Sequence, residues 1–98
     1  MAEAKQQTLS CKLKGEIIVS RPFDFEALCL INDMIMRGDK GKFSAAYNAL
    51  PYMFEGTKIT NEVISCMEMT ELGLMCDELW GFYLEEIQRM SDMKLKNK

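Results

Sequence analysis

The pattern of apolar and polar positions predicts a short β-hairpin at the start of the chain. From Thr8 to Lys14 every second residue is apolar, which is the period of a half-buried strand. Lys14 and Gly15 suit a tight turn in which the glycine takes a positive φ, and residues 16–20 (EIIVS) then form a second strand. A lone hairpin is marginal in water, so it must pack on helices or pair with a strand of a second copy. The second option hints at a homo-oligomer formed through the hairpin strands.

Residues 23–37 predict a helix that is apolar over most of its surface. Its polar residues Glu26, Asp33 and Arg37 fall in one narrow wedge. A helix of this kind is buried on several sides at once, so we expect it to be the core helix of the fold. Asp24 is placed to cap its first free N–H groups.

The turn RGDKGK (residues 37–42) leads to a second predicted helix at residues 42–54. Pro51 is expected to break or kink this helix near residues 48–50. Core packing is the favoured role of the YMF segment (residues 52–54), with a partner-binding patch as the alternative. The predicted buried face consists of Phe43, Ala46, Tyr47, Leu50 and Phe54.

Thr60 is expected to cap a third helix, with Ile59 and Ile64 placed to form a hydrophobic staple. The longest periodic run follows at residues 72–93. At Thr70 and Gly73 the sequence permits either a bend or a break between these two helices, and we favour a break.

The apolar residues of the run at 72–93 cover an arc of about 160°, wider than the stripe that a surface helix needs. Glu86 projects from the middle of this arc, so it is neutralised, paired, or placed at an edge open to solvent or to a partner; we favour the edge. The wide arc makes this helix the candidate partner-binding element. The candidate residues are Met75, Leu79, Trp80, Phe82, Tyr83, Glu86 and Met90.

Composition predicts one small domain spanning residues 1–98, with residues 1–7 and 94–98 as disordered tails. No apolar run is long enough for a membrane span and the start lacks a signal-peptide pattern, so we expect a cytoplasmic protein. The four cysteines form no C-x-x-C pair, and three of them fall on predicted apolar helix faces. Buried free thiols are therefore expected.

The sequence offers little catalytic chemistry. It contains no histidine, the commonest general base and metal ligand. The adjacent carboxylates at 77–78 and 85–86 point about 100° apart on a helix, so they form neither an acid–base dyad nor a metal cage. We therefore predict no catalytic residues, cofactor or metal, and no enzyme activity. Residues 60–93 hold one basic residue against eight acidic ones, which disfavours direct binding of nucleic acid.

Nine methionines suggest an adaptable apolar surface, although core packing is their favoured role. A groove for an apolar helix can be lined by Met67 with Met69, Met75 beside Trp80, and Met90 with Met93. The acidic residues around such a groove would favour a basic amphipathic partner.

Two stretches resemble the small tail assembly chaperones of long-tailed bacteriophages and prophages. The first is DFEALCLIND (residues 24–33) after a hairpin, matching D-F-x-A-L-x-x-[IL]-[NE]-[DE]. The second is GTKITNEVI (residues 56–64), matching G-T-x-[IL]-T-x-E-x-[IL]. The likeness covers residues 8–90. It implies a non-enzymatic factor in the cytoplasm of a bacterial host cell, which binds apolar helices of the tape measure protein and helps to recruit tail tube protein.

The sequence as a whole predicts an α+β domain, mainly α, with an N-terminal β-hairpin packed on a bundle of about four helices. The alternative function is that of a small acidic regulatory adaptor or inhibitor, a nucleic-acid mimic that uses the charged face of residues 60–93 to cover a basic protein surface.

Overall fold

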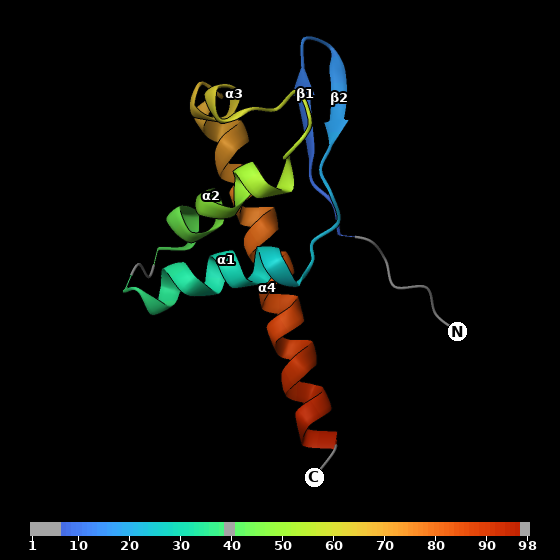
Figure 1. The fold of residues 1–98 in the computed structure, drawn as a ribbon, viewed down its shortest axis with the longest axis vertical. Coiled ribbons are helices and arrows are strands. Elements are labelled where there is room, and N and C mark those ends of the chain that lie inside the picture. Colours follow the sequence, from blue (N-terminus) through green and yellow to red (C-terminus); the bar gives the residue numbers. More distant parts are fainter. Residues whose placement is uncertain (1–6, 39–40, 97–98) are drawn as a thin grey trace, which may run out of the picture.

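The computed structural model describes residues 7–38 and 41–96, and it confirms the predicted fold class: a two-stranded hairpin packed on four helices (Figure 1). The elements are β1 (Ser10–Leu13), β2 (Glu16–Val19), α1 (Phe25–Met36), α2 (Lys42–Met53), α3 (Asn61–Ser65) and α4 (Met69–Lys96). Within the described ranges the single sheet has the order β1-β2.

The hairpin forms as its sequence predicts. β1 and β2 pair antiparallel, with Cys11 opposite Ile18 and Leu13 opposite Glu16. The two turn residues have φ angles of 52° at Lys14 and 83° at Gly15. Positive φ at both positions gives a turn whose twist matches the twist of the strands.

One face of the hairpin is buried against the helices. Leu9 and Cys11 lie in the core, and Leu13 packs against it. At the open end, the buried Ser20 hydroxyl accepts a hydrogen bond from the Leu9 N–H (2.8 Å) and donates one to the carbonyl of Arg21 (2.8 Å). The buried Ser20 hydroxyl and the Leu9 N–H therefore both have hydrogen-bond partners.

The core lies where α2 and α4 pack together between α1 and the hairpin. Figure 1 shows α4 running along the longest dimension of the molecule, with α1 and α2 crossing it on one side and the hairpin on the other. Beyond α1, the C-terminal part of α4 has no other described helix or strand beside it. The largest fully buried side chains are Leu9, Ile31, Leu50, Met53, Phe54, Ile64 and Leu79.

The expectation that residues 23–37 form a helix buried on several sides is wrong. Helix α1 buries only Ala27, Leu28 and Ile31, while Phe25 at its start and Met36 at its end are exposed. The helix lies at one side of the bundle, so only one of its faces meets α2 and α4. The predicted cap is confirmed, because the Asp24 carboxylate accepts a hydrogen bond from the Ala27 N–H at 3.0 Å.

Helix α2 packs through a face of small residues. Its buried residues include Ala45, Ala46 and Ala49, whereas Phe43 and Tyr47, predicted to be buried, are exposed. Alanines let the helix approach its neighbours closely, and this choice of face rotates the two aromatic residues outward.

Of the break or kink predicted at Pro51, the break does not occur. The helix continues to Met53, and the Phe54 N–H donates to the Leu50 carbonyl at 3.1 Å beyond the proline. A proline inside a helix costs about 3 kcal/mol. Burying Leu50 and Met53 completely returns about 1.5–3 kcal/mol for each side chain, so packing of the last turn outweighs the cost. Of the turn that leads into this helix, residues 39 and 40 lie outside the described part, and Gly38 has a φ of 100°.

Residues 61–96 form two helices, as favoured from the sequence, but the break falls at residues 66–68 and Gly73 lies inside α4. The Thr60 hydroxyl caps α3 by accepting from the Val63 N–H at 3.3 Å. At the start of α4, the Glu68 carboxylate accepts from the Glu71 N–H at 3.2 Å. Helix α4 continues to Lys96, so residues 94–96 are helical where a disordered tail was expected.

Candidate partner-binding surface

The two buried thiols lack the features of reactive cysteines. All four cysteines are free, with Cys11 and Cys76 buried. Burial raises the pKa of both thiols, and the nearby charge of Glu71 raises the pKa of Cys11 further, so both stay protonated at neutral pH. Cys66 is exposed, contrary to the prediction of an apolar face, because it lies at the C-terminal end of α3.

Two further findings concern metals and membranes. In the described part of the chain, no group of three or more histidine, cysteine, aspartate or glutamate residues is placed to hold a metal ion. Among the described helices, none has the length and apolar character that crossing a bilayer requires.

The seven candidate residues on α4 do not form one exposed groove. Met75, Leu79 and Tyr83 are buried, so they stabilise the fold and are not available to a partner. The Tyr83 hydroxyl donates to the Asn32 side chain at 3.0 Å and thereby links α4 to α1. The prediction expected an arc of about 160° to be wide enough to leave a contact surface at all seven positions, whereas the centre of that arc is the side on which α4 meets the core.

The remaining candidates lie at the margin of the core. Trp80 and Phe82 are half-buried, and the Phe82 ring lies 6.0 Å from the ring of Phe23. Glu86 is half-buried and forms an ion pair with Arg89 one turn later, so it is paired as well as close to an open edge. Met90 is exposed on the projecting part of α4, together with Leu84, Ile87 and Met93.

A different apolar surface lies between α2 and the first half of α4. This α2–α4 groove is an open hollow of about 540 Å³ with no charged residue in its lining, which consists of Phe43, Ser44, Tyr47, Met69, Leu72, Gly73 and Cys76. Met69 is 85% exposed, Phe43 53% and Tyr47 41%. Three large apolar side chains therefore remain in water on adjoining helices.

The local structure explains why the groove stays open. The alanine face of α2 brings the backbones of α2 and α4 close together, and Gly73 supplies no side chain to fill the space above that contact. A Cβ atom added at Gly73 would meet nothing within 4 Å. An ion pair between Lys42 Nζ and Asp77 Oδ1 (2.6 Å) ties the two helices together beside the groove.

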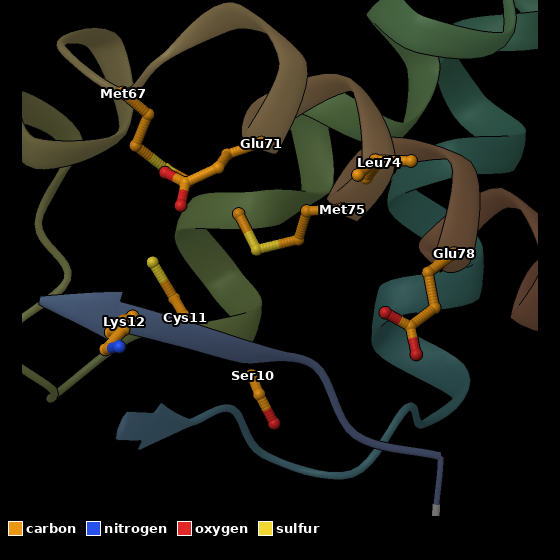
Figure 2. Close-up of a pocket in the computed structure, with 8 residues that line it drawn as sticks. All are labelled: Ser10, Cys11, Lys12, Met67, Glu71, Leu74, Met75 and Glu78. Carbon is orange, nitrogen blue, oxygen red and sulfur yellow. The ribbon is translucent and has the colours of Figure 1, made fainter. Parts of the chain in front are cut away.

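A second, smaller hollow of about 180 Å³ lies between β1 and α4 (Figure 2). Cys11, Met75 and Glu71 point toward one another across it, while Ser10 points away from α4. Its lining is mixed in character: Ser10, Cys11, Lys12, Met67, Glu71, Leu74, Met75 and Glu78. A third hollow, of about 410 Å³, follows the end of α2 and is lined by residues from Pro51 to Asn61.

The alanines of residues 42–54 are a sequence feature that could have indicated the α2–α4 groove. Hydrophobic periodicity alone does not make use of this feature. Two neighbouring faces of a helix over residues 42–54 are candidates for burial. One presents the aromatic residues Phe43 and Tyr47, and the other presents the alanines Ala45 and Ala49. The predicted face is confirmed at three residues that are buried, Ala46, Leu50 and Phe54. Close helix packing selects Ala45 and Ala49 in place of the more hydrophobic Phe43 and Tyr47. The cluster of three alanines was therefore the informative feature.

Comparisons with protein-family models, curated proteins and solved structures found no match to this chain.

Proposed function

We propose that this protein is a non-enzymatic binding factor that holds an apolar helical segment of a partner protein in the α2–α4 groove. The observation that carries the proposal is the exposure of Phe43, Tyr47 and Met69 around an uncharged hollow on two packed helices. Exposed apolar clusters on a small protein mark contact surfaces, because leaving them in water has a free-energy cost.

The lining suits a helix better than a rigid small molecule. A helix in a groove is recognised through apolar side chains spaced three or four residues apart. Met69 is flexible and can adjust to side chains of different shape, which suits a protein that binds many related apolar segments. The Tyr47 ring offers apolar surface while its hydroxyl can remain in water.

The resemblance of residues 24–33 and 56–64 to tail assembly chaperones supports a specific partner. We propose the tape measure protein as the bound helix and tail tube protein as a further partner, with the cytoplasm of a bacterial host cell as the site of action. The apolar groove supports this role because a factor that keeps long, aggregation-prone helices soluble must cover apolar surface.

The test is co-expression with a tape measure protein of a long-tailed bacteriophage, followed by measurement of the soluble fraction of that protein. Met69→Asp is the decisive variant. Met69 is the first residue of α4, where an acidic side chain is favoured by the helix dipole, so the fold should be kept while a charge enters the groove. Losing the burial of one methionine corresponds to about a ten- to hundredfold loss of affinity.

Phe25→Asp is the matched control. Phe25 is the first residue of α1 and is also exposed, but it lies outside the groove. We expect the wild type and Phe25→Asp to keep the tape measure protein soluble and Met69→Asp to fail. The proposal is overturned if the tape measure protein is equally soluble alone, or if Met69→Asp behaves like the wild type.

A further pair of variants identifies an acidic adaptor. Glu85 and Asp92 are exposed on α4, outside both the groove and the core. If reversing both charges to lysine abolishes partner binding while Met69→Asp leaves it unchanged, the acidic face is the contact surface and the groove is not.

A further inference from the structure

The outer edge of β1 carries backbone groups that no described residue uses. The Ser20 N–H donates to the Leu9 carbonyl at 2.8 Å, so Leu9 and Ser20 form a hydrogen-bonded pair. Hydrogen-bonded and non-hydrogen-bonded pairs alternate along an antiparallel ladder. The N–H and C=O groups of Ser10 and Lys12, which face Val19 and Ile17, therefore point away from β2.

This edge opens onto the smaller hollow. In Figure 2, β2 lies on one side of β1 and α4 lies on the other, with the hollow between β1 and α4. Its volume of about 180 Å³ is below the roughly 300 Å³ at which small-molecule sites begin. The space suits one side chain of a peptide whose backbone runs along the strand.

Two carboxylates on α4 face this space without a cationic partner. Glu71 and Glu78 both line the hollow, and they lie seven residues apart, which places them on the same side of the helix about 10 Å apart. Neither side chain forms an ion pair with any residue in the described ranges. Lys12 is the only cation in the lining, and Figure 2 shows Glu78 on the Ser10 side of the hollow, away from it.

We propose that the free edge of β1 takes an extended basic segment of a partner protein as an added strand. The Ser10 and Lys12 backbone groups bind the segment by main-chain hydrogen bonds. One lysine or arginine of the segment enters the hollow and meets Glu71, and a second basic residue of the segment lies near Glu78. This contact is separate from the α2–α4 groove and does not depend on the function proposed for it.

A second copy of this chain suits the same edge less well than a basic segment. Glu71 and Glu78 line the hollow beside the edge, and the chain carries a net charge of −3, so a basic segment complements the charge of the site better than another copy does.

The experiment uses the full chain, labelled with ¹⁵N, and the blocked peptide acetyl-TKVRVK-amide as the probe. On binding, the amides of Ser10 and Lys12 should shift and exchange more slowly with solvent, while those of Ile17 and Val19 on the other edge should not. The peptide acetyl-TEVEVE-amide should not bind. Two further peptides carry N-methyl groups at alternate residues, one on each edge, and only one of these two should bind.

Protein variants separate the backbone contact from the charge contact. Ser10→Pro removes an outward N–H and should abolish binding, whereas Val19→Pro removes the equivalent N–H on the outer edge of β2 and should leave binding intact. Glu78→Lys changes an exposed side chain and should weaken binding about two- to fivefold, the scale of an exposed ion pair. If Ser10→Pro does not fold, Glu78→Lys and the methylated peptides still decide.

Several results would overturn the proposal. Equal binding of the acidic peptide removes the charge argument, and equal binding of both methylated peptides removes the strand argument. Slow exchange at Ser10 and Lys12 in the free chain that grows with protein concentration would assign this edge to a second copy.

Discussion

Asp24 stabilises the connection between the hairpin and α1 through two hydrogen bonds. Its carboxylate accepts the Ala27 N–H at 3.0 Å and the Tyr52 hydroxyl at 2.6 Å, so one side chain caps α1 and joins it to the end of α2. The Arg21 guanidinium lies 4.1 Å from the centre of the Tyr52 ring and pairs with Glu55. The segment between β2 and α1 is therefore held by a network that begins at one residue.

Asp24→Ala should lower the free energy of unfolding by about 1–2 kcal/mol, because it removes a helix cap and leaves Tyr52 without its acceptor. Asp33→Ala is the control: it removes the same charge from α1 at an exposed position where the side chain has no partner among the described residues. Its effect should stay within about 0.5 kcal/mol. Urea unfolding of the three proteins measures both, and equal losses would contradict a capping role for Asp24.

The charge of Asp24 should also make stability depend on pH. Partial burial acts to raise its pKa, but the hydrogen bonds from Tyr52 and Ala27 and the charge of Arg21 lower the pKa below its ordinary value of 3.8. A lowered folded pKa adds stability above pH 3.8, and this stability is lost as the pH falls through the folded pKa. Asp24→Asn keeps an oxygen acceptor without the charge. The wild type should exceed it in stability at pH 6, and the difference should shrink toward pH 3.

The sequence predicted individual local interactions more successfully than it predicted packing. Asp24 and Thr60 as caps and Lys14-Gly15 as the turn were all predicted, because each depends on backbone groups within three residues. The partner of Asp24 in α2 could not be predicted, because Tyr52 lies 28 residues further on and is brought there only by packing.

Among the elements, α4 carries two glycines that local structure does not require. Gly73 and Gly81 lie inside the helix, and an added Cβ atom at either would meet nothing within 4 Å. Replacing each with alanine should raise the free energy of unfolding by about 0.5–1 kcal/mol, because alanine loses less backbone entropy in a helix. Thermal unfolding should show an increase of a few degrees for each variant.

Gly15→Ala should lower the melting temperature in the same thermal unfolding experiment. Gly15 has a φ of 83°, so alanine there should destabilise the hairpin although space is available. If Gly73→Ala lowered the melting temperature instead, another group would have to occupy the space above Gly73, and the α2–α4 groove would not be open in solution.

Element positions were predicted better than element faces. The hairpin and the helices are found near their expected places, but α1 proved to be a peripheral helix and α2 turned its aromatic residues outward. Hydrophobic periodicity gives the side of a helix that prefers burial, not whether enough neighbours exist to cover it. A chain of 98 residues has too few elements to cover every apolar face, so Phe25, Phe43 and Met69 stay exposed.

For the whole molecule, the consequence is a core shared by most elements and a long helix that extends past it. The predicted contact residues Met75, Leu79 and Tyr83 are core residues because they lie where α4 crosses the other helices. The exposed apolar surfaces are found where that crossing ends: beside Met69 at one end of α4 and around Met90 at the other. The sequence predicted a long helix here, but the point where it crosses the other helices required the tertiary structure.

This arrangement predicts that residues 91–98 contribute little to stability. The described part of this segment lies on the projecting end of α4, and the side chains from Ser91 to Lys94 are exposed. Ending the chain after Met90 should change the free energy of unfolding by less than about 0.5 kcal/mol, because the described side chains that it removes, Ser91 to Lys94, are exposed. In contrast, Tyr83→Ala deletes a buried ring and its bond to Asn32, and should cost about 3 kcal/mol or more.

Chemical unfolding at several protein concentrations checks this prediction. If the truncated chain and the full chain have the same stability at every concentration, the end of α4 is free in the isolated protein and its apolar residues remain available to a partner. If truncation removes stability that grows with protein concentration in the full chain, a second copy contacts the removed segment, in which Met93 is the exposed apolar residue. The α4 end would then be the dimer contact, in place of the hairpin strands that the sequence suggested for that role.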